Sequence, residues 1–285
     1  MKPFSIPVAA IGPGSQAPEP LAVERFAPME PVERPAFPKI EAGRHDAAAR
    51  TVQALLGHAE AYDPRRTADR RVDVTRLDPA DDRLLNEALG QGEVSIVVTR
   101  PGAARIQETA FAGVWRVRCF DASGAMNADY LELAPIPDVV RDAAASATAG
   151  GLEWGAPPAG VMNAESILKE IRGKAAGFAT GQIHVINLSL LPVSPEDVAF
   201  INATLGTGPV TMLSRGYGKC RITATTLRHV WLVQYFNLMD TLILNTIEIT
   251  AMPEVALAAP DDIADAARRL EELAEWMLSA EVAAP

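Results

Sequence analysis

Cysteine is scarce in this sequence: the 285 residues contain two, Cys119 and Cys220. Two thiols can form neither a disulfide framework nor a four-thiolate metal site. The four histidines are scattered and show no metal-ligand spacing. We therefore expect no metal, no other cofactor and a reducing compartment.

Positive charge and long apolar runs are also in short supply. The 26 Lys and Arg residues face 36 Asp and Glu residues, which gives a formal net charge of −10. This balance disfavours a nucleic-acid binder and docking on an anionic membrane. No run approaches the roughly 20 apolar residues that span a bilayer, and prolines interrupt the first residues, where a signal peptide needs an apolar core. The sequence predicts a cytoplasmic protein that binds neither nucleic acid nor membrane.

Proline, in contrast, is concentrated at the start of the chain, where residues 1–45 hold nine of the 22 prolines. Proline favours extended backbone because its ring fixes φ and it has no N–H donor. The sequence predicts an extended arm here. Apolar side chains such as Phe4, Ile6 and Phe37 recur along it, so the arm could pack onto the domains or engage a partner.

The rest of the chain contains an internal repeat. Residues 79–139 and 195–255 align without a gap at an offset of 116, and 18 of the 61 aligned pairs are identical. Asp78-Pro79 and Ser194-Pro195 are helix-start signals, because the first residue can cap the helix and proline suits its first turn. The matched residue types are mostly caps, stops, turns and core, as two copies of one fold require.

We therefore predict an α+β fold with two copies of a helix–strand–helix unit followed by an antiparallel meander, related by a pseudo-twofold axis. The first copy covers residues 46–140, residues 141–162 are an Ala-, Gly- and Pro-rich linker, and residues 163–285 form the second copy. The second copy adds a C-terminal helix over about 261–279, where apolar residues recur at helical spacing. Asn163 is expected to cap its first helix.

The residues show no catalytic constellation, so we expect no enzyme. The most individual stretch is a loop and strand start in the second copy, and we predict partner binding through Arg215, Gly216, Tyr217, Gly218, Lys219, Cys220 and Arg221. Arg and Tyr are residue types that anchor interfaces, although a plain hairpin turn would also explain the glycines. Two neighbouring cations would lower the pKa of a thiol, so Cys220 is either reactive or a small packed residue, as Ala104 is in the first copy.

The same stretches carry a family resemblance. LSRGYGKCRI, VWLVQYFN, LILNTIEI and MPEVA resemble the C-terminal half of the HupH/HyaF family of hydrogenase expression proteins, and PFSIPVAAIGPGSQ and MNAESILKEI extend the resemblance over most of the chain. Two positions depart from the family pattern: Lys219 stands where we expect Asn, and Leu257 where many members carry Cys. The second departure weakens the case for a shared two-cysteine metal or redox site.

The resemblance implies an accessory protein, not an enzyme, for the maturation of uptake [NiFe] hydrogenases. It implies a chaperone or assembly factor that binds the precursor of the iron–sulfur small subunit in the cytoplasm before twin-arginine export. Two alternatives remain open: an iron–sulfur cluster-handling or redox protein that uses Cys220, and a scaffold that binds other hydrogenase accessory proteins.

Overall fold

The computed structural model describes residues 46–66, 68–148, 151–215 and 218–282, so the predicted arm at 1–45 lies outside the described residues. The first half of the chain contains α1 (Asp46–Glu60), β1 (Arg71–Asp73), α2 (Pro79–Leu89), β2 (Val94–Val98), β3 (Ala103–Glu108), β4 (Val114–Phe120), β5 (Met126–Leu133) and α3 (Asp138–Ala145). The second half contains α4 (Ala164–Ala176), β6 (His184–Asn187), α5 (Pro195–Leu205), β7 (Val210–Ser214), β8 (Lys219–Ala224), β9 (Val230–Phe236), β10 (Leu242–Ile249), the 3₁₀ turn η1 (Glu254–Ala256) and α6 (Pro260–Val282). The predicted α+β class is confirmed.

Five elements of the first half recur in the second half with both bounds displaced by 116 residues, as from Pro79 to Pro195. These pairs are α2 and α5, β2 and β7, β3 and β8, β4 and β9, and β5 and β10. We call two residues 116 positions apart counterparts.

The strands of the described residues form one sheet in the order β1-β5-β4-β3-β2-β7-β8-β9-β10-β6. The two halves join at its centre, where β2 pairs antiparallel with β7 and Ile96 lies opposite Met212. These two residues are themselves counterparts, since 212 − 96 = 116. From this centre, β2, β3, β4 and β5 follow one another in one direction, and their counterparts β7, β8, β9 and β10 follow in the same order in the other direction.

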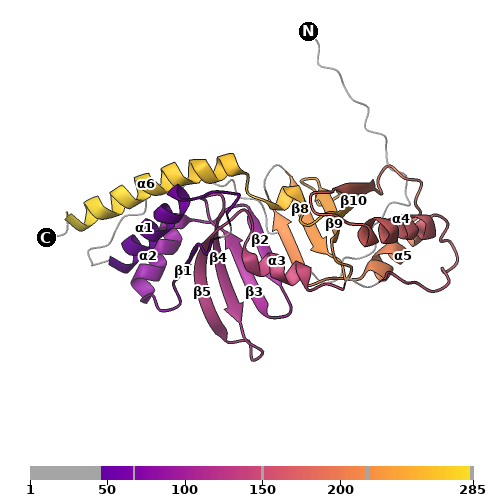
Figure 1. Ribbon diagram of the computed structural model, residues 1–285, viewed down its shortest axis with the longest axis horizontal. Helices are drawn as coiled ribbons and strands as arrows, with labels where there is room; N and C mark the ends of the chain where they lie inside the picture. The colour runs from indigo at the N-terminus through magenta and orange to yellow at the C-terminus, as the bar shows by residue number, and fades with distance from the viewer. Residues whose placement is uncertain (1–45, 67, 149–150, 216–217, 283–285) are drawn as a thin grey trace, which may run out of the picture.

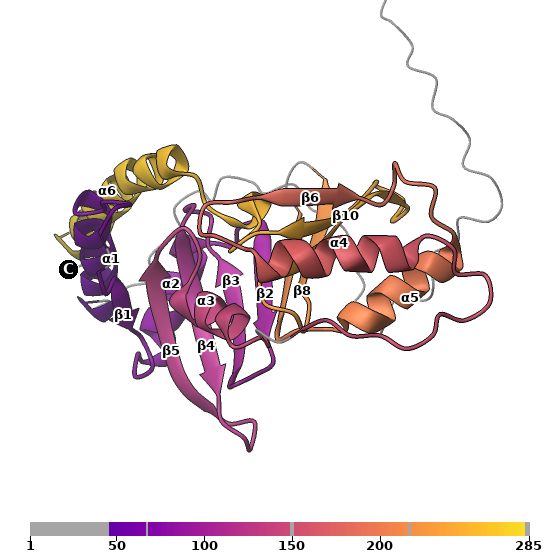
Figure 2. The same ribbon diagram turned by 45° about the vertical axis from the view of Figure 1, so that its right-hand side comes forward.

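The two faces of the sheet are covered differently. Trp115 and Trp231 lie on one face and pack with Val140 of α3 in a central core. Glu132 and Glu248 lie opposite these tryptophans in the strand pairing and therefore share their face. Side chains alternate along a strand, so the next residues, Leu133 and Ile249, point to the opposite face. On that opposite face, α1, α2 and α6 cover one end and α4 and α5 cover the other end. Figures 1 and 2 show these two helical layers at the ends of the sheet, with α3 over its middle.

A single buried carboxylate starts both helices of the second layer. Asp197 lies at the third position of α5, where it completes a capping box with Ser194. Its Oδ1 also accepts N–H bonds of 2.8 Å from Asn163 and 2.9 Å from Ala164 at the start of α4. The expectation that Asn163 caps α4 through its own side chain is wrong: that amide donates to the carbonyl of Pro192 instead.

The C-terminal helix belongs to the second half of the chain but packs on the first half. The apolar stripe of α6, which includes Ile263 and Leu270, is buried against Val52 and Leu55 of α1 in one hydrophobic cluster. An amphipathic stripe shows that a helix is buried on one side, but not against which neighbour. Among the described residues, no helix is both long and apolar enough to cross a bilayer.

The segment between the copies is less irregular than its composition indicates. Residues 138–145 form α3, whose Val140 and Ala143 are buried under the sheet. Leu152 and Trp154 then pack on α4 and its neighbours. The Ala-rich sequence therefore includes a short helix held by tertiary contacts, which favour helices far more than propensity does.

Candidate functional site

Two strand connections of the second half lie side by side at one end of the sheet. One joins β7 to β8 and the other joins β9 to β10, and β8 pairs with β9 so that Lys219 faces Phe236. The connections are tied together by an ion pair of 2.6 Å between Nζ of Lys219 and Oδ1 of Asp240. The Lys219 side chain is buried and that of Asp240 is largely exposed, so the pair fixes a turn that faces solvent.

Large apolar side chains of this turn are exposed to solvent. Leu238 is 79% exposed, Met239 is 82% exposed and Ile243 at the start of β10 is 58% exposed. Their counterparts in the first half are small or polar: Ala122, Ser123 and Asn127. Isolated exposed apolar residues are common on protein surfaces, but neighbouring ones mark interaction sites. We call the group formed by Arg215, Lys219, Leu238, Met239, Asp240 and Ile243 the hairpin-tip surface.

The backbone of this turn keeps the left-handed conformation of its counterpart, but the residue that adopts it differs. Asp240 has φ 58°, in the left-handed region, where its counterpart Gly124 has φ 84°. A glycine adopts this region freely, whereas a residue with a Cβ atom does so at a cost, which is smallest for Asn and Asp. In the second half, the side chain of this strained residue forms the ion pair with Lys219, whose counterpart is Ala103.

The residues predicted to bind a partner, Arg215 to Arg221, lie partly on strands and partly outside the described residues. Gly216 and Tyr217 lie outside the described residues, and Gly218 has φ 142°. Arg215 continues β7, because its N–H donates to the carbonyl of Glu93 at 3.0 Å. The structure therefore brings Arg215 and Lys219 to the same end of the sheet.

Arg221 belongs to the framework that both halves share. Its guanidinium lies 5.4 Å from the centre of the Phe236 ring, and the counterpart Arg105 lies 5.7 Å from that of Phe120. A contact repeated at counterpart positions supports the fold of both copies. Arg221 therefore gives no reason to distinguish the second copy.

Cys220 lies in the central core and not on the hairpin-tip surface. It is 2% exposed and packs in the cluster that contains Ile222 and Trp231. Burial raises its pKa to about 12, although a hydrogen bond with Tyr235 acts in the opposite direction. This is contrary to the activation expected from the flanking cations, because alternation along β8 directs Lys219 and Arg221 to the opposite face.

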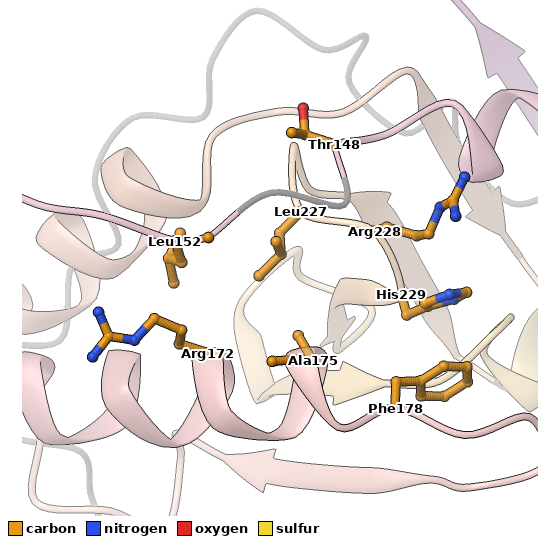
Figure 3. A pocket seen from close by; sticks show the side chains of 10 residues that line it. Thr148, Leu152, Arg172, Ala175, Phe178, Leu227, Arg228 and His229 are labelled. Carbon is orange, nitrogen blue, oxygen red and sulfur yellow. The ribbon is translucent and has the colours of Figure 1, made fainter.

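A cavity of about 290 Å³ opens in the second half and was not predicted. It lies between the C-terminal end of α4, the segment at Gly151 and Leu152, and the connection from β8 to β9. Figure 3 shows Leu152, Leu227 and Ala175 around this space, with His229 stacked on Phe178 at one side. The sequence did contain one signal, since His229 replaces its counterpart Gly113 at a turn.

Metal ligands are not gathered at either place. Within the described ranges, no group of three or more His, Cys, Asp or Glu side chains is arranged to hold a metal ion. The second half thus presents an exposed apolar turn and a cavity lined in part by cationic side chains.

Comparison with known proteins agrees with the resemblance seen in the sequence. The family described as HupH hydrogenase expression protein, C-terminal conserved region, matches residues 47–150 and 161–277. The hydrogenase expression/formation protein HoxQ of Cupriavidus necator is 43% identical over 284 residues, which cover 97% of this chain and 99% of HoxQ. The hydrogenase-1 operon protein HyaF of Escherichia coli is 35% identical over 73% of this chain and 74% of its own length.

One solved structure is also similar in sequence. A hydrogenase expression protein HupH from Thiobacillus denitrificans is 29% identical and aligns over 39% of this chain and 92% of its own, with a TM-score of 0.37. The matched residues of the family extend over both halves described above. The chain belongs to the HupH family of hydrogenase expression proteins.

Proposed function

We propose that this protein is an assembly factor for the iron–sulfur small subunit of a [NiFe] hydrogenase, which binds the subunit precursor in the cytoplasm before twin-arginine export. Its relatives are named hydrogenase expression or formation proteins, and such a name fits an accessory role without catalysis. The observation that carries the proposal is the exposed apolar turn at Leu238 and Met239, which the first half of the same fold lacks.

The hairpin-tip surface has the composition of a transient interface. Leu238 and Met239 are apolar and face solvent, and the unbranched methionine side chain adapts to irregular partner surfaces. The Lys219–Asp240 pair holds the turn in place, so less conformational entropy is lost when a partner binds. Arg215 lies at the rim, where a cation can meet an acidic group of the partner. We assign the first contact with the precursor to this surface.

The experiment is co-purification of the tagged protein with the small-subunit precursor from cells that express the hydrogenase. We expect Leu238→Ser/Met239→Ser to reduce recovery of the precursor by about tenfold or more, and Arg215→Ala to reduce it by less. Met126→Ser is the matched control, because Met126 is 48% exposed at the corresponding hairpin of the first half. Equal recovery with the double variant would remove the hairpin-tip surface from the proposal.

The same experiment separates the alternatives. If the wild-type protein recovers another accessory protein and no precursor, it is a scaffold and the assembly-factor proposal fails. A cluster-handling role for Cys220 predicts that Cys220→Ser abolishes maturation of the hydrogenase. The burial of this thiol disfavours that role.

We further propose that the two halves are copies related by a pseudo-twofold axis through the centre of the sheet. The identical displacement of five element pairs and the pairing of Ile96 with Met212 support this arrangement. On this view residues 46–140 and 163–285 are the two units, with residues 141–162 between them and residues 1–45 as an arm.

A further inference from the structure

The cavity beside α4 lies at the opposite end of β9 from the hairpin-tip surface. Leu227 and His229 lie in the connection that precedes β9, and Ala175 and Phe178 lie at the end of α4. Leu152, which is buried, forms a further wall. The lining combines apolar side chains with the cationic Arg172 and Arg228.

In the first half, the same place is occupied by the chain itself. The counterparts of Leu227 and His229 are Phe111 and Gly113. A Cβ atom on Gly113 would lie 2.7 Å from Cγ1 of Ile263 in the first turn of α6. The counterparts of the α4 residues belong to the same cluster, which also contains Ile263. An apolar side chain near the start of a helix therefore fills the counterpart of the cavity.

Further contacts hold α6 at this place. Arg269 of α6 donates to the carbonyl of Ala110 at 2.8 Å, and its guanidinium lies 4.6 Å from the centre of the Phe111 ring. No described residue of the second half supplies an equivalent of α6, since the helices there are α4 and α5. The cavity thus corresponds to the position that the start of α6 occupies in the first half.

The residues around the cavity differ from their counterparts in charge and in strain. Arg172 replaces Leu56 and Arg228 replaces Ala112, so two cations have been gained. His229 has φ 65° at the position of a glycine and stacks on Phe178 with ring centres 4.1 Å apart. Strained backbone outside glycine is often found at functional sites.

The gained cations lie at separate sides of the cavity. The guanidinium of Arg172 lies 5.0 Å from the centre of the Trp154 ring, and that of Arg228 donates to the carbonyl of Ala145 through Nε at 2.9 Å. Both contacts orient the side chains, and no carboxylate of the described part of the chain forms an ion pair with either guanidinium. An acidic residue on an incoming segment would complement them.

We propose that this cavity binds the first turn of a partner helix that carries Asp or Glu directly before a branched apolar residue, as α6 carries Asp261 and Asp262 before Ile263. The apolar side chain enters between Leu227 and Ala175, whose counterparts Phe111 and Ala59 share one hydrophobic cluster with Ile263. The acidic residues face Arg172 and Arg228. The helix comes from a partner polypeptide, because α6 of this chain is already packed on α1.

The test uses the full chain and, as probe, a fluorescent peptide with the sequence of residues 258–279. We expect saturable binding by fluorescence anisotropy. Filling the cavity with Ala175→Leu or Ala176→Trp should weaken binding by about tenfold or more, and so should Ile263→Ser in the peptide. Lys174→Ala, on the exposed side of the same helix, is the matched control and should leave binding unchanged. Peptides with Asp261→Asn/Asp262→Asn should bind more weakly at low salt and equally at high salt.

The proposal is overturned if the peptide does not bind, or if both cavity variants fold by circular dichroism and bind it as the wild type does. The peptide could instead displace α6 and bind to α1. Changes at Ala175 and Ala176 would not affect such binding, so that result would also overturn the proposal. No hydrogenase component is present in this assay. Its result is therefore independent of whether the hairpin-tip surface recognises the small-subunit precursor.

Discussion

Replacing Asp197 with alanine should destabilise the protein more than any other single change at a helix start. The carboxylate is fully buried. It accepts four backbone N–H bonds: Met162 at 2.8 Å, Asn163 at 2.8 Å and Ala164 at 2.9 Å to Oδ1, and Ser194 at 3.0 Å to Oδ2. The change therefore removes the cap of α4 and half of the capping box of α5 together.

The magnitude follows from what is left behind. A lost helix cap costs about 1 kcal/mol, and a buried donor that loses a charged acceptor costs about 1–3 kcal/mol. The four donors are neighbours, so their losses do not add fully. We expect Asp197→Ala to lower the free energy of unfolding by about 3–5 kcal/mol, which is a large part of the roughly 5–15 kcal/mol typical of a folded protein.

The assay is urea unfolding followed by circular dichroism at pH 7. Ser194→Ala is the control, because it removes the cap of α5 alone and should cost about 1 kcal/mol. Burial raises the pKa of Asp197, but the backbone N–H bonds outweigh it, and the net pKa lies below the usual value. The contribution of the carboxylate is thus present above about pH 4 and lost as the pH falls through the lowered pKa. If Asp197→Ala costs no more than Ser194→Ala at pH 7, the shared-cap account is wrong.

Three further predictions concern buried ionisable groups. Burial raises the pKa of Glu108 to about 7, so the folded protein keeps this proton at pH values where the unfolded chain has lost it. The free energy of unfolding should therefore fall by roughly 3 kcal/mol as the pH rises from 4.5 to 7. Urea titrations at several pH values should show that Glu108→Gln abolishes this fall. Asp129→Asn should cost about 2–4 kcal/mol in the same assay, because it leaves the buried guanidinium of Arg116 short of its bidentate partner. Arg116→Leu/Asp129→Asn, the pair found at the counterpart positions, should recover most of that loss, and failure to recover would contradict the account. Cys220 in a Cys119→Ser background should react with a disulfide reagent about a thousandfold more slowly in the folded than in the unfolded protein at pH 8; comparable rates would show that the thiol is accessible.

The helices and strands could be predicted because their local signals are strong and occur twice. Asp78 accepts the N–H groups of Ala80 and Asp81, and Gly90 ends the helix with positive φ, as the sequence indicated. Trp231 and Val233 alternate along β9, as the side chains on one face of a strand do, and both are buried. Each of these signals acts within a few residues.

The sequence alone could not show how these elements meet. The pairing of β2 with β7 joins residues 116 positions apart and depends on both complete units. The position of α6 depends on the apolar side chains of α1, and an apolar stripe does not select one apolar surface over another. The short helix α3 was hidden by a composition typical of linkers, because Val140 and Ala143 stabilise it only when they are packed under the sheet.

The candidate surfaces were only partly visible for the same reason. Arg215 and Lys219 of the predicted loop lie at the same end of the sheet as the turn at Leu238 and Met239, but this turn belongs to the next strand connection along the chain, so the sequence did not show that they are neighbours. The cavity combines residues from three segments. Comparison of counterparts would have indicated both places, since a glycine in one copy is a side chain in the other.

At two turns, a glycine of the first half corresponds to a larger residue of the second half, and both turns border a surface at which the two halves differ. Among the described residues, His229 and Asp240 are the non-glycine residues with positive φ, and their counterparts are Gly113 and Gly124. Each substitution costs about 1 kcal/mol in backbone strain, so neither improves the fold by itself. In return, Asp240 fixes the exposed turn through Lys219, and His229 lines a cavity that α6 fills in the other half. Both strained residues make contacts that their glycine counterparts cannot make, Asp240 with Lys219 and His229 with Phe178. If the two binding proposals above hold, partner binding belongs to the second half, whereas in the first half α6 covers the equivalent position.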